Sequence, residues 1–178
     1  FPGSPDSGPG LTAEGIALIK HANALNMLID VSHMNEKAFW DTARHSSSPL
    51  VATHSNAHTL CPQPRNLTDR QLLAIRDSGG VAGVNFGNAF LRADGKRDSD
   101  TPLSTIVRHI DYLINIMGDD HVALGSDFDG ITLPDDLHDV SGLPRLISAL
   151  RDSGYDQFVL NKLLWGNWQK VLQNVWQQ

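Results

Sequence analysis

Short apolar runs alternate with segments of helical spacing along this chain of 178 residues, and this alternation restricts the fold more than any other feature. The apolar runs cover residues 27–31, 50–53, 81–86 and 121–126. Strands that are apolar on both faces and are separated by helices form parallel sheets in βαβ units. The sequence therefore predicts an α/β fold with four parallel strands, adjacent and in chain order, and with helices flanking the sheet.

Capping residues indicate where the helices between these strands begin. Thr12 is expected to cap the first helix. Thr68 and Gln71 form a capping-box pattern ahead of another. Thr101 is expected to cap a long helix that has Pro102 at its first position. Two or three further helices are expected after the last strand.

A polar side chain that could take part in a reaction lies at the C-terminal end of each predicted strand: these are His33, His54, Asn85 and Asp127. In a (β/α)₈ barrel the active site is assembled at the C-terminal ends of the strands, and several strands contribute one residue each. A doubly wound sheet is the alternative, but such sheets usually carry a Gly-rich first turn, and neither G-x-G-x-x-G nor a Walker-type sequence occurs here. We therefore favour half of a TIM-type (β/α)₈ barrel.

Two histidines at equivalent strand ends point to a metal site. A lone histidine is more often a hydrogen-bonded structural residue, but His33, His54 and the later Asp127 together favour metal-assisted hydrolysis. Neutral imidazole binds zinc and related ions, and a carboxylate beside the activated water can accept its proton. Asp30 and Asp129 are expected to orient a ligand histidine by hydrogen bonding.

Arg65 lies in the loop after the second histidine strand. Its guanidinium could bind a substrate carboxylate through two parallel hydrogen bonds. The alternative is an ordinary solvated charge on a surface loop.

Composition excludes several classes of function. The net charge of −6 and the absence of a basic run argue against nucleic-acid binding. No apolar stretch approaches the ~20 residues that a membrane-spanning helix needs, and the opening residues lack the pattern of a signal peptide. A single cysteine, Cys61, excludes an internal disulfide. If the source is bacterial, a soluble protein of the cytoplasm or periplasm is expected.

Five segments in a fixed order resemble the membrane (renal) dipeptidase family of zinc metallopeptidases: "LIDVSH", "ATHSNA", "PRNLTD", "GGVAGVNF" and "ALGSDFDG". The resemblance runs from about Gly10 to the "WGNWQKVL" segment. It implies a barrel similar to those of the amidohydrolases, two zinc ions per complete active site, and hydrolysis of dipeptides by a zinc-bridging hydroxide.

The resemblance also implies roles for individual residues. His33 and His54 would bind the second zinc. Arg65 would bind the substrate, and Asp127 would contact the substrate and handle the proton. Asn85 is not part of this resemblance; its place at a strand end predicts a supporting role like that of Asp30 and Asp129.

The same family uses a His-x-Asp pair on its first strand, a glutamate that bridges both zinc ions, and a further substrate-binding histidine. The residues ahead of Thr12, "FPGSPDSGPGL", contain none of these. Residues 1–178 are therefore expected to form the C-terminal part of one metallo-dipeptidase domain, with a loop at 1–11 and a C-terminal helix at 166–178. The expected partners are a dipeptide substrate, the missing N-terminal half and, as an alternative assembly, a second copy of the chain. The chain alone is expected to be inactive.

Two other functions stay open on the sequence alone. One is a different amidohydrolase-type metal hydrolase that acts on a lactone or an amide. The other is a non-catalytic half-barrel that binds a partner. Arg65 favours a substrate with a free carboxylate and hence the dipeptidase.

Overall fold

A computed structural model describes residues 8–177, in which helices and strands alternate as expected. In chain order the elements are α1 (Ala13–Ala24), β1 (Ile29–Asp30), α2 (Glu36–His45), β2 (Leu50–Ala52), α3 (Asp69–Asp77), β3 (Val81–Asn85), α4 (Asn88–Leu91), α5 (Leu103–Met117), β4 (Val122–Ser126), η1 (Val140–Gly142), α6 (Leu143–Asp152), α7 (Gln157–Asn161), η2 (Lys162–Gly166) and α8 (Asn167–Trp176). Of the expected N-terminal loop, residues 8–11 are neither helix nor strand, and residues 1–7 lie outside the described residues. None of the helices within residues 8–177 is long and apolar enough to span a bilayer.

The strands form one parallel sheet in the order β1-β2-β3-β4. In the register, Ile29 lies opposite Leu50, and Ala82 lies opposite Val122. This arrangement confirms the predicted parallel, sequential strands with flanking helices. It is the architecture of half of a (β/α)₈ barrel.

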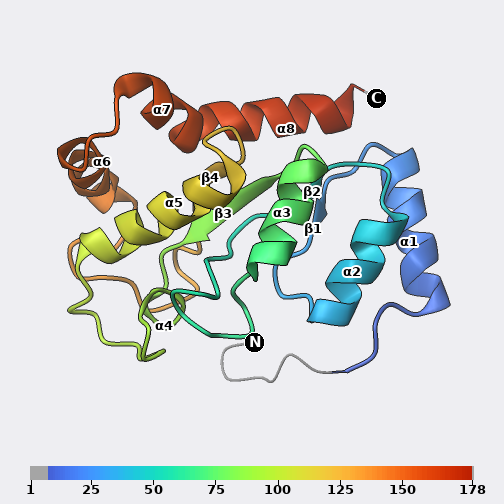
Figure 1. The fold of residues 1–178 in the computed structure, drawn as a ribbon, viewed down its shortest axis with the longest axis horizontal. Helices are drawn as coiled ribbons and strands as arrows, with labels where there is room; N and C mark the ends of the chain where they lie inside the picture. Colours follow the sequence, from blue (N-terminus) through green and yellow to red (C-terminus); the bar gives the residue numbers. More distant parts are fainter. Residues whose placement is uncertain (1–7, 178) are drawn as a thin grey trace.

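Both faces of the sheet are buried, which explains why its strands are apolar throughout. Successive side chains of a strand point to opposite faces. One set of strand residues packs in the larger core with residues of α3 and α5: Ala52, Ala82, Val84, Val122, Leu72 and Ile110. The alternate set packs with a residue of α8: Val51, Val81, Ala123 and Val171. In Figure 1, α3 and α5 lie in front of the strands, and α8 runs along the upper side of the molecule.

Helix starts agree with two of the three expected caps. The Thr12 hydroxyl accepts a hydrogen bond from Gly15 N at 3.1 Å, and Thr68 N donates to Gln71 Oε1 at 2.8 Å. The Thr101 cap is wrong. Pro102, which has an extended backbone, occupies the N-cap position of α5, and the Thr101 hydroxyl instead donates to Asp98 O in the preceding loop.

Helix α8 covers the edge of β4 that faces away from β3. Carbonyl groups along a parallel strand alternate between its two sides, so those of Val122 and Leu124 point outward. Asn167 Nδ2 donates to Val122 O at 2.8 Å, and Trp168 Nε1 donates to Leu124 O at 3.0 Å. Side chains of the "WGNW" segment therefore satisfy backbone groups at this edge.

Candidate metal and substrate site

The two strand-end histidines meet beyond the C-terminal ends of β1 and β2. His33 Nε2 lies 2.9 Å from His54 Nε2, and the rings make an edge-on contact. His33 has a φ of 71°, in the left-handed region that residues other than glycine enter only when their surroundings hold them there. The side chains from two neighbouring strands therefore converge on one point, on the same side of the sheet.

This pair fits a zinc ion as two of its ligands. Zinc–imidazole bonds of about 2.0–2.1 Å in a tetrahedral site place two ligand nitrogens about 3.3 Å apart, slightly more than the distance found here. Within residues 8–177, no group of three or more His, Cys, Asp or Glu side chains is arranged to hold a metal ion. Because catalytic zinc normally has three protein ligands, the described residues could supply only part of a zinc site.

Asp30 and Thr53 hold His54 in place. Asp30 Oδ1 accepts from Ser32 N at 2.9 Å and from Thr53 N at 3.0 Å, and its Oδ2 accepts from the Thr53 hydroxyl at 2.5 Å. Thr53 Oγ1 in turn lies 2.6 Å from His54 Nδ1. The Ser32 hydroxyl also accepts from His54 N at 3.1 Å. Sequence reasoning found Asp30 and missed Thr53, although Thr53 directly precedes the histidine in "ATHS".

Arg65 is buried beside the histidines, so the alternative of a solvated loop residue is wrong. The residue is 6% exposed, and its guanidinium lies over the Phe90 ring at 5.4 Å. Its hydrogen bonds to Ser55 Oγ and His54 O are long, at 3.4 and 3.5 Å, and Nε has no partner among the described residues. Burial of this kind with weak partners leaves donors for a planar anion.

Asp127 follows β4, and Asn85 at the end of β3 binds it. Asn85 Nδ2 donates to Asp127 Oδ2 at 2.9 Å. Gly87 N donates to Asn85 Oδ1 at 2.7 Å, so the NH₂ group of the amide must face the carboxylate. Ser126 and Asp127 both have positive φ, 42° and 67°, which makes the chain turn sharply after β4.

Asn56, which sequence reasoning missed, anchors Asn85. Its Oδ1 accepts from Asn85 N, and its Nδ2 donates to Asn85 O, both at 2.9 Å. Asn56 N also donates to Asn66 Oδ1 at 3.3 Å, next to Arg65 in the chain. The only signal in the sequence was its position two residues after His54. These bonds connect the loop that carries Arg65 to the strand that carries Asn85.

Electrostatic interactions connect His33, His54, Arg65 and Asp127. Burial lowers the pKa of His33. The nearby Arg65 and His54 lower this pKa further, whereas the Asp127 carboxylate raises it. Burial also lowers the pKa of Arg65, against the effect of the carboxylates of Asp127 and Asp30. Asp127, which follows β4, therefore acts on residues that follow β1 and β2. Asp129 is exposed in the following loop, and its expected role stays a prediction.

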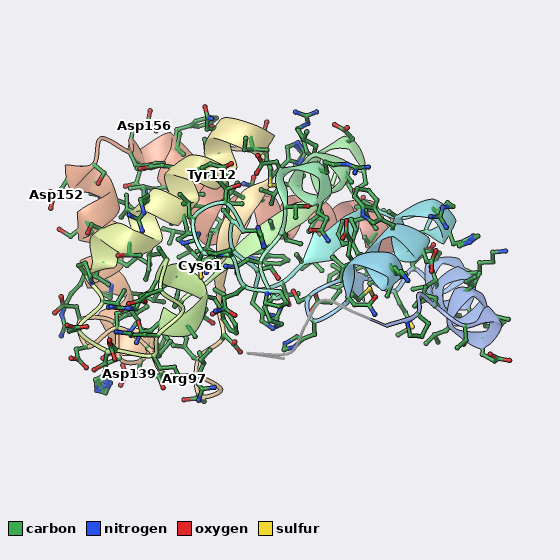
Figure 2. All side chains as sticks on the ribbon, turned by 60° about the horizontal axis from the view of Figure 1, so that its bottom comes forward. Cys61, Arg97, Tyr112, Asp139, Asp152 and Asp156 are labelled. Carbon is green, nitrogen blue, oxygen red and sulfur yellow. The ribbon has the colours of Figure 1, made fainter. Side chains whose placement is uncertain are left out.

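Two buried residues that could be mistaken for site residues are structural. Cys61 lies in the interior of the molecule (Figure 2), and burial raises the pKa of its thiol to about 11, which makes it a poor nucleophile at neutral pH. His109 and Asp111 form a His-x-Asp sequence, but both lie in the middle of α5. His109 Nε2 pairs with Leu91 O at 3.0 Å, and the Asp111 carboxylate accepts from the Tyr155 hydroxyl.

Comparisons with known proteins show what the chain is similar to. A family model described as membrane dipeptidase (Peptidase family M19) matches residues 3–178. A Klebsiella pneumoniae protein, named only as an uncharacterized protein in the pqqA 5′ region, is 84% identical over the whole chain. An uncharacterized dipeptidase of Schizosaccharomyces pombe is 40% identical over 83% of the chain. A metallo peptidase from Rhodobacter sphaeroides, solved with a phosphinate mimic of the dipeptide L-Ala-D-Ala, is 52% identical over 99% of the chain, with a TM-score of 0.96.

These relatives are longer than the chain. It spans 66% of the Klebsiella protein, 35% of the S. pombe protein and 50% of the Rhodobacter chain. The site of the described residues therefore corresponds to one part of a larger protein in each comparison.

Proposed function

The chain belongs to the membrane dipeptidase family, Peptidase family M19, and we propose that the complete protein is a zinc-dependent dipeptidase to which this chain contributes the second half of the active-site barrel. The observation that carries the proposal is the convergence of His33 Nε2 and His54 Nε2 at 2.9 Å from the ends of two parallel strands. Two imidazoles in this position suit zinc, and the rest of the coordination sphere would come from the first half of the barrel.

His33 and His54 would hold one of two zinc ions. Bound zinc would supply an activated water and polarise the peptide carbonyl. The task of the chain's own residues is to place the ion, the substrate carboxylate and the proton acceptor within reach of one another.

Arg65 would bind the C-terminal carboxylate of the dipeptide. Its guanidinium is buried, its protein hydrogen bonds are long, and Nε is without a partner in the described part of the chain. A bidentate carboxylate would satisfy these donors. The dipeptide mimic bound by the Rhodobacter protein supports a substrate of this class.

Asp127 would accept the proton of the attacking water and pass it to the leaving amine. Asn85 engages Oδ2 of this carboxylate, and Oδ1 would then be the oxygen that accepts the proton. Positioned acids and bases of this kind typically contribute ~10²–10⁴-fold to the rate.

The 178-residue chain by itself should hydrolyse no dipeptide. Two histidines and one carboxylate do not define two metal positions, and the described residues hold no group of three ligands. Addition of the N-terminal half, in cis or in trans, should restore turnover.

The test uses the full-length protein with L-Ala-D-Ala as substrate. Hydrolysis should stop when zinc is removed by a chelator and should return with added zinc. His33→Ala and His54→Ala should lose zinc and activity, whereas His21→Ala, on the exposed surface of α1, should keep both. Hydrolysis that survives metal removal would contradict the proposal, and turnover of a lactone but of no dipeptide would favour the other amidohydrolase chemistry.

A further inference from the structure

A continuous chain of hydrogen bonds leads from Asp30 through Thr53 to the back of the His54 ring. Asp30 Oδ2 lies 2.5 Å from Thr53 Oγ1, which lies 2.6 Å from His54 Nδ1. The Nε2 atom on the other side of this ring is the one that meets His33. The three residues come from neighbouring strand ends, 23 positions apart between Asp30 and Thr53.

The number of available hydrogens determines the direction of each bond. Asp30 accepts two backbone N–H groups on Oδ1, and its Oδ2 accepts the single hydrogen of the Thr53 hydroxyl. Thr53 has then no hydrogen left to give to His54. Its oxygen must accept one, which places a hydrogen on His54 Nδ1 and leaves Nε2 with a free electron pair.

We propose that Thr53, set by Asp30, is a positioning residue that holds His54 in the Nδ1–H tautomer and so presents its Nε2 electron pair to the metal. The inference rests on the proposed zinc site and adds to it a residue that touches neither metal nor substrate. Metal-binding histidines usually donate their second N–H to an outer partner, and loss of that partner typically costs 10–100-fold in metal affinity or activity.

Cohesion between the strands does not require the Thr53 hydroxyl. The Thr53 backbone N–H already binds Asp30 Oδ1 at 3.0 Å, and the His54 backbone N–H binds the Ser32 hydroxyl at 3.1 Å. These bonds join β1 to β2 without the Thr53 side chain. The hydroxyl is therefore placed for an effect on the imidazole ring.

The experiment measures zinc affinity of the full-length protein by competition with a chelator, without substrate. Thr53→Val keeps the shape of the side chain and removes the hydroxyl, and it should weaken zinc binding by about 10- to 100-fold. Thr53→Ser restores the hydroxyl and should bind zinc within about threefold of the parent protein. Thr59→Val, the same change at an exposed loop position, should have no effect.

A second readout reports the tautomer directly. In metal-free protein labelled with ¹⁵N-histidine, the His54 signals should show the proton on Nδ1. Asp30→Asn can still accept the two backbone N–H groups, but its NH₂ group would then donate to Thr53, whose hydroxyl would turn to donate to His54 Nδ1. This variant should move the His54 proton to Nε2 and weaken zinc binding at least as much as Thr53→Val.

Parent-like zinc affinity in both Thr53→Val and Asp30→Asn, with the His54 proton still on Nδ1, would overturn the inference. Thermal unfolding of each variant shows whether the substitution has caused a general loss of structure. Where it has, zinc binding by Thr53→Ser is decisive: a serine variant that binds zinc as weakly as the valine variant would also overturn the inference. Failure of the parent protein to hydrolyse L-Ala-D-Ala would count against the proposed function alone, because the zinc and tautomer measurements need no substrate.

Discussion

Replacement of Asn85 by aspartate would test whether the hydrogen bond from the Asn85 amide supports Asp127 as the proton acceptor. The Nδ2 atom of Asn85 lies 2.9 Å from Asp127 Oδ2, and its Oδ1 is bound by Gly87 N. Asn85→Asp is isosteric and keeps the bond from Gly87, so its only large effect is to place a second carboxyl group against Asp127.

Two carboxylates this close cannot both be charged at low cost. Two unit charges about 4 Å apart repel by about 4 kcal/mol at an effective dielectric constant of about 20. The pair therefore keeps one proton, and the pKa of that proton is raised well above the usual range of a carboxyl group. While the proton is present, the new carboxyl donates it to Asp127 as the amide did. Once it is lost, the pair carries two negative charges.

The assay compares kcat/KM for L-Ala-D-Ala in the full-length variant and parent from about pH 5.5 to about pH 9. The kcat/KM of Asn85→Asp, divided by that of the parent, should be near one at low pH and should fall as pH rises. Asn85→Ala, which removes the donor, should lose about 10- to 100-fold at every pH, because a hydrogen bond to a charged group is worth ~1.5–3 kcal/mol. Asn161→Asp, the same charge change on exposed α7, should match the parent. A ratio for Asn85→Asp that is independent of pH would refute the reasoning.

Three further predictions concern Arg65, Asp127 and His109. Arg65→Lys should lower kcat/KM for a dipeptide about tenfold or more, because lysine cannot form the two parallel hydrogen bonds that a guanidinium forms with a carboxylate. Amidation of the substrate's carboxylate should remove most of this difference. Equal impairment on the amide would contradict the role of Arg65 in binding the carboxylate. Asp127→Asn should reduce kcat by ~10²–10⁴-fold while the protein still binds zinc. If the variant loses zinc but still turns over substrate, Asp127 is a structural ligand. Burial lowers the pKa of His109 from 6.5 to about 4, so its contribution to stability is complete above pH 6.5 and is lost as pH falls toward 4, by roughly 3 kcal/mol. In urea unfolding of metal-free protein, His109→Gln should therefore lose less stability than the parent between pH 7 and pH 4, and parallel losses would contradict this.

Much of the fold could be read from local sequence. Strands apolar on both faces, separated by helices, predicted a parallel sheet in chain order, and the structure has that order. Capping side chains such as Thr12 act within a few residues of their own position, so their roles were visible in the sequence. The Thr101 cap failed because the extended backbone of Pro102 starts α5 one residue later, which a short motif does not specify.

The positions of the candidate site residues were also predictable, but the hydrogen bonds that hold them in place were not. Parallel strands bring their C-terminal ends to one side of a sheet, so His33, His54, Asn85 and Asp127 were expected to lie together. The burial of Arg65 was not predictable, because it depends on how the loop after β2 folds over Phe90. The amide of Asn56 looked like an ordinary loop residue until its bonds to both backbone groups of Asn85 were seen.

The sequence by itself determined the alternation of elements, the polar residues at the strand ends and the order of the motifs that resemble the dipeptidase family. Only the tertiary structure decided that Asp30 reaches Thr53, that Thr53 reaches the Nδ1 side of His54, and that the amide of Asn85 faces Asp127. The physical reason is that the Asp30–Thr53 and Asn85–Asp127 bonds join residues on different strands, and the bond from Asp30 also fixes the hydroxyl that meets His54. Their geometry depends on the register between β1 and β2 and between β3 and β4, which packing of the whole sheet sets and no local pattern encodes.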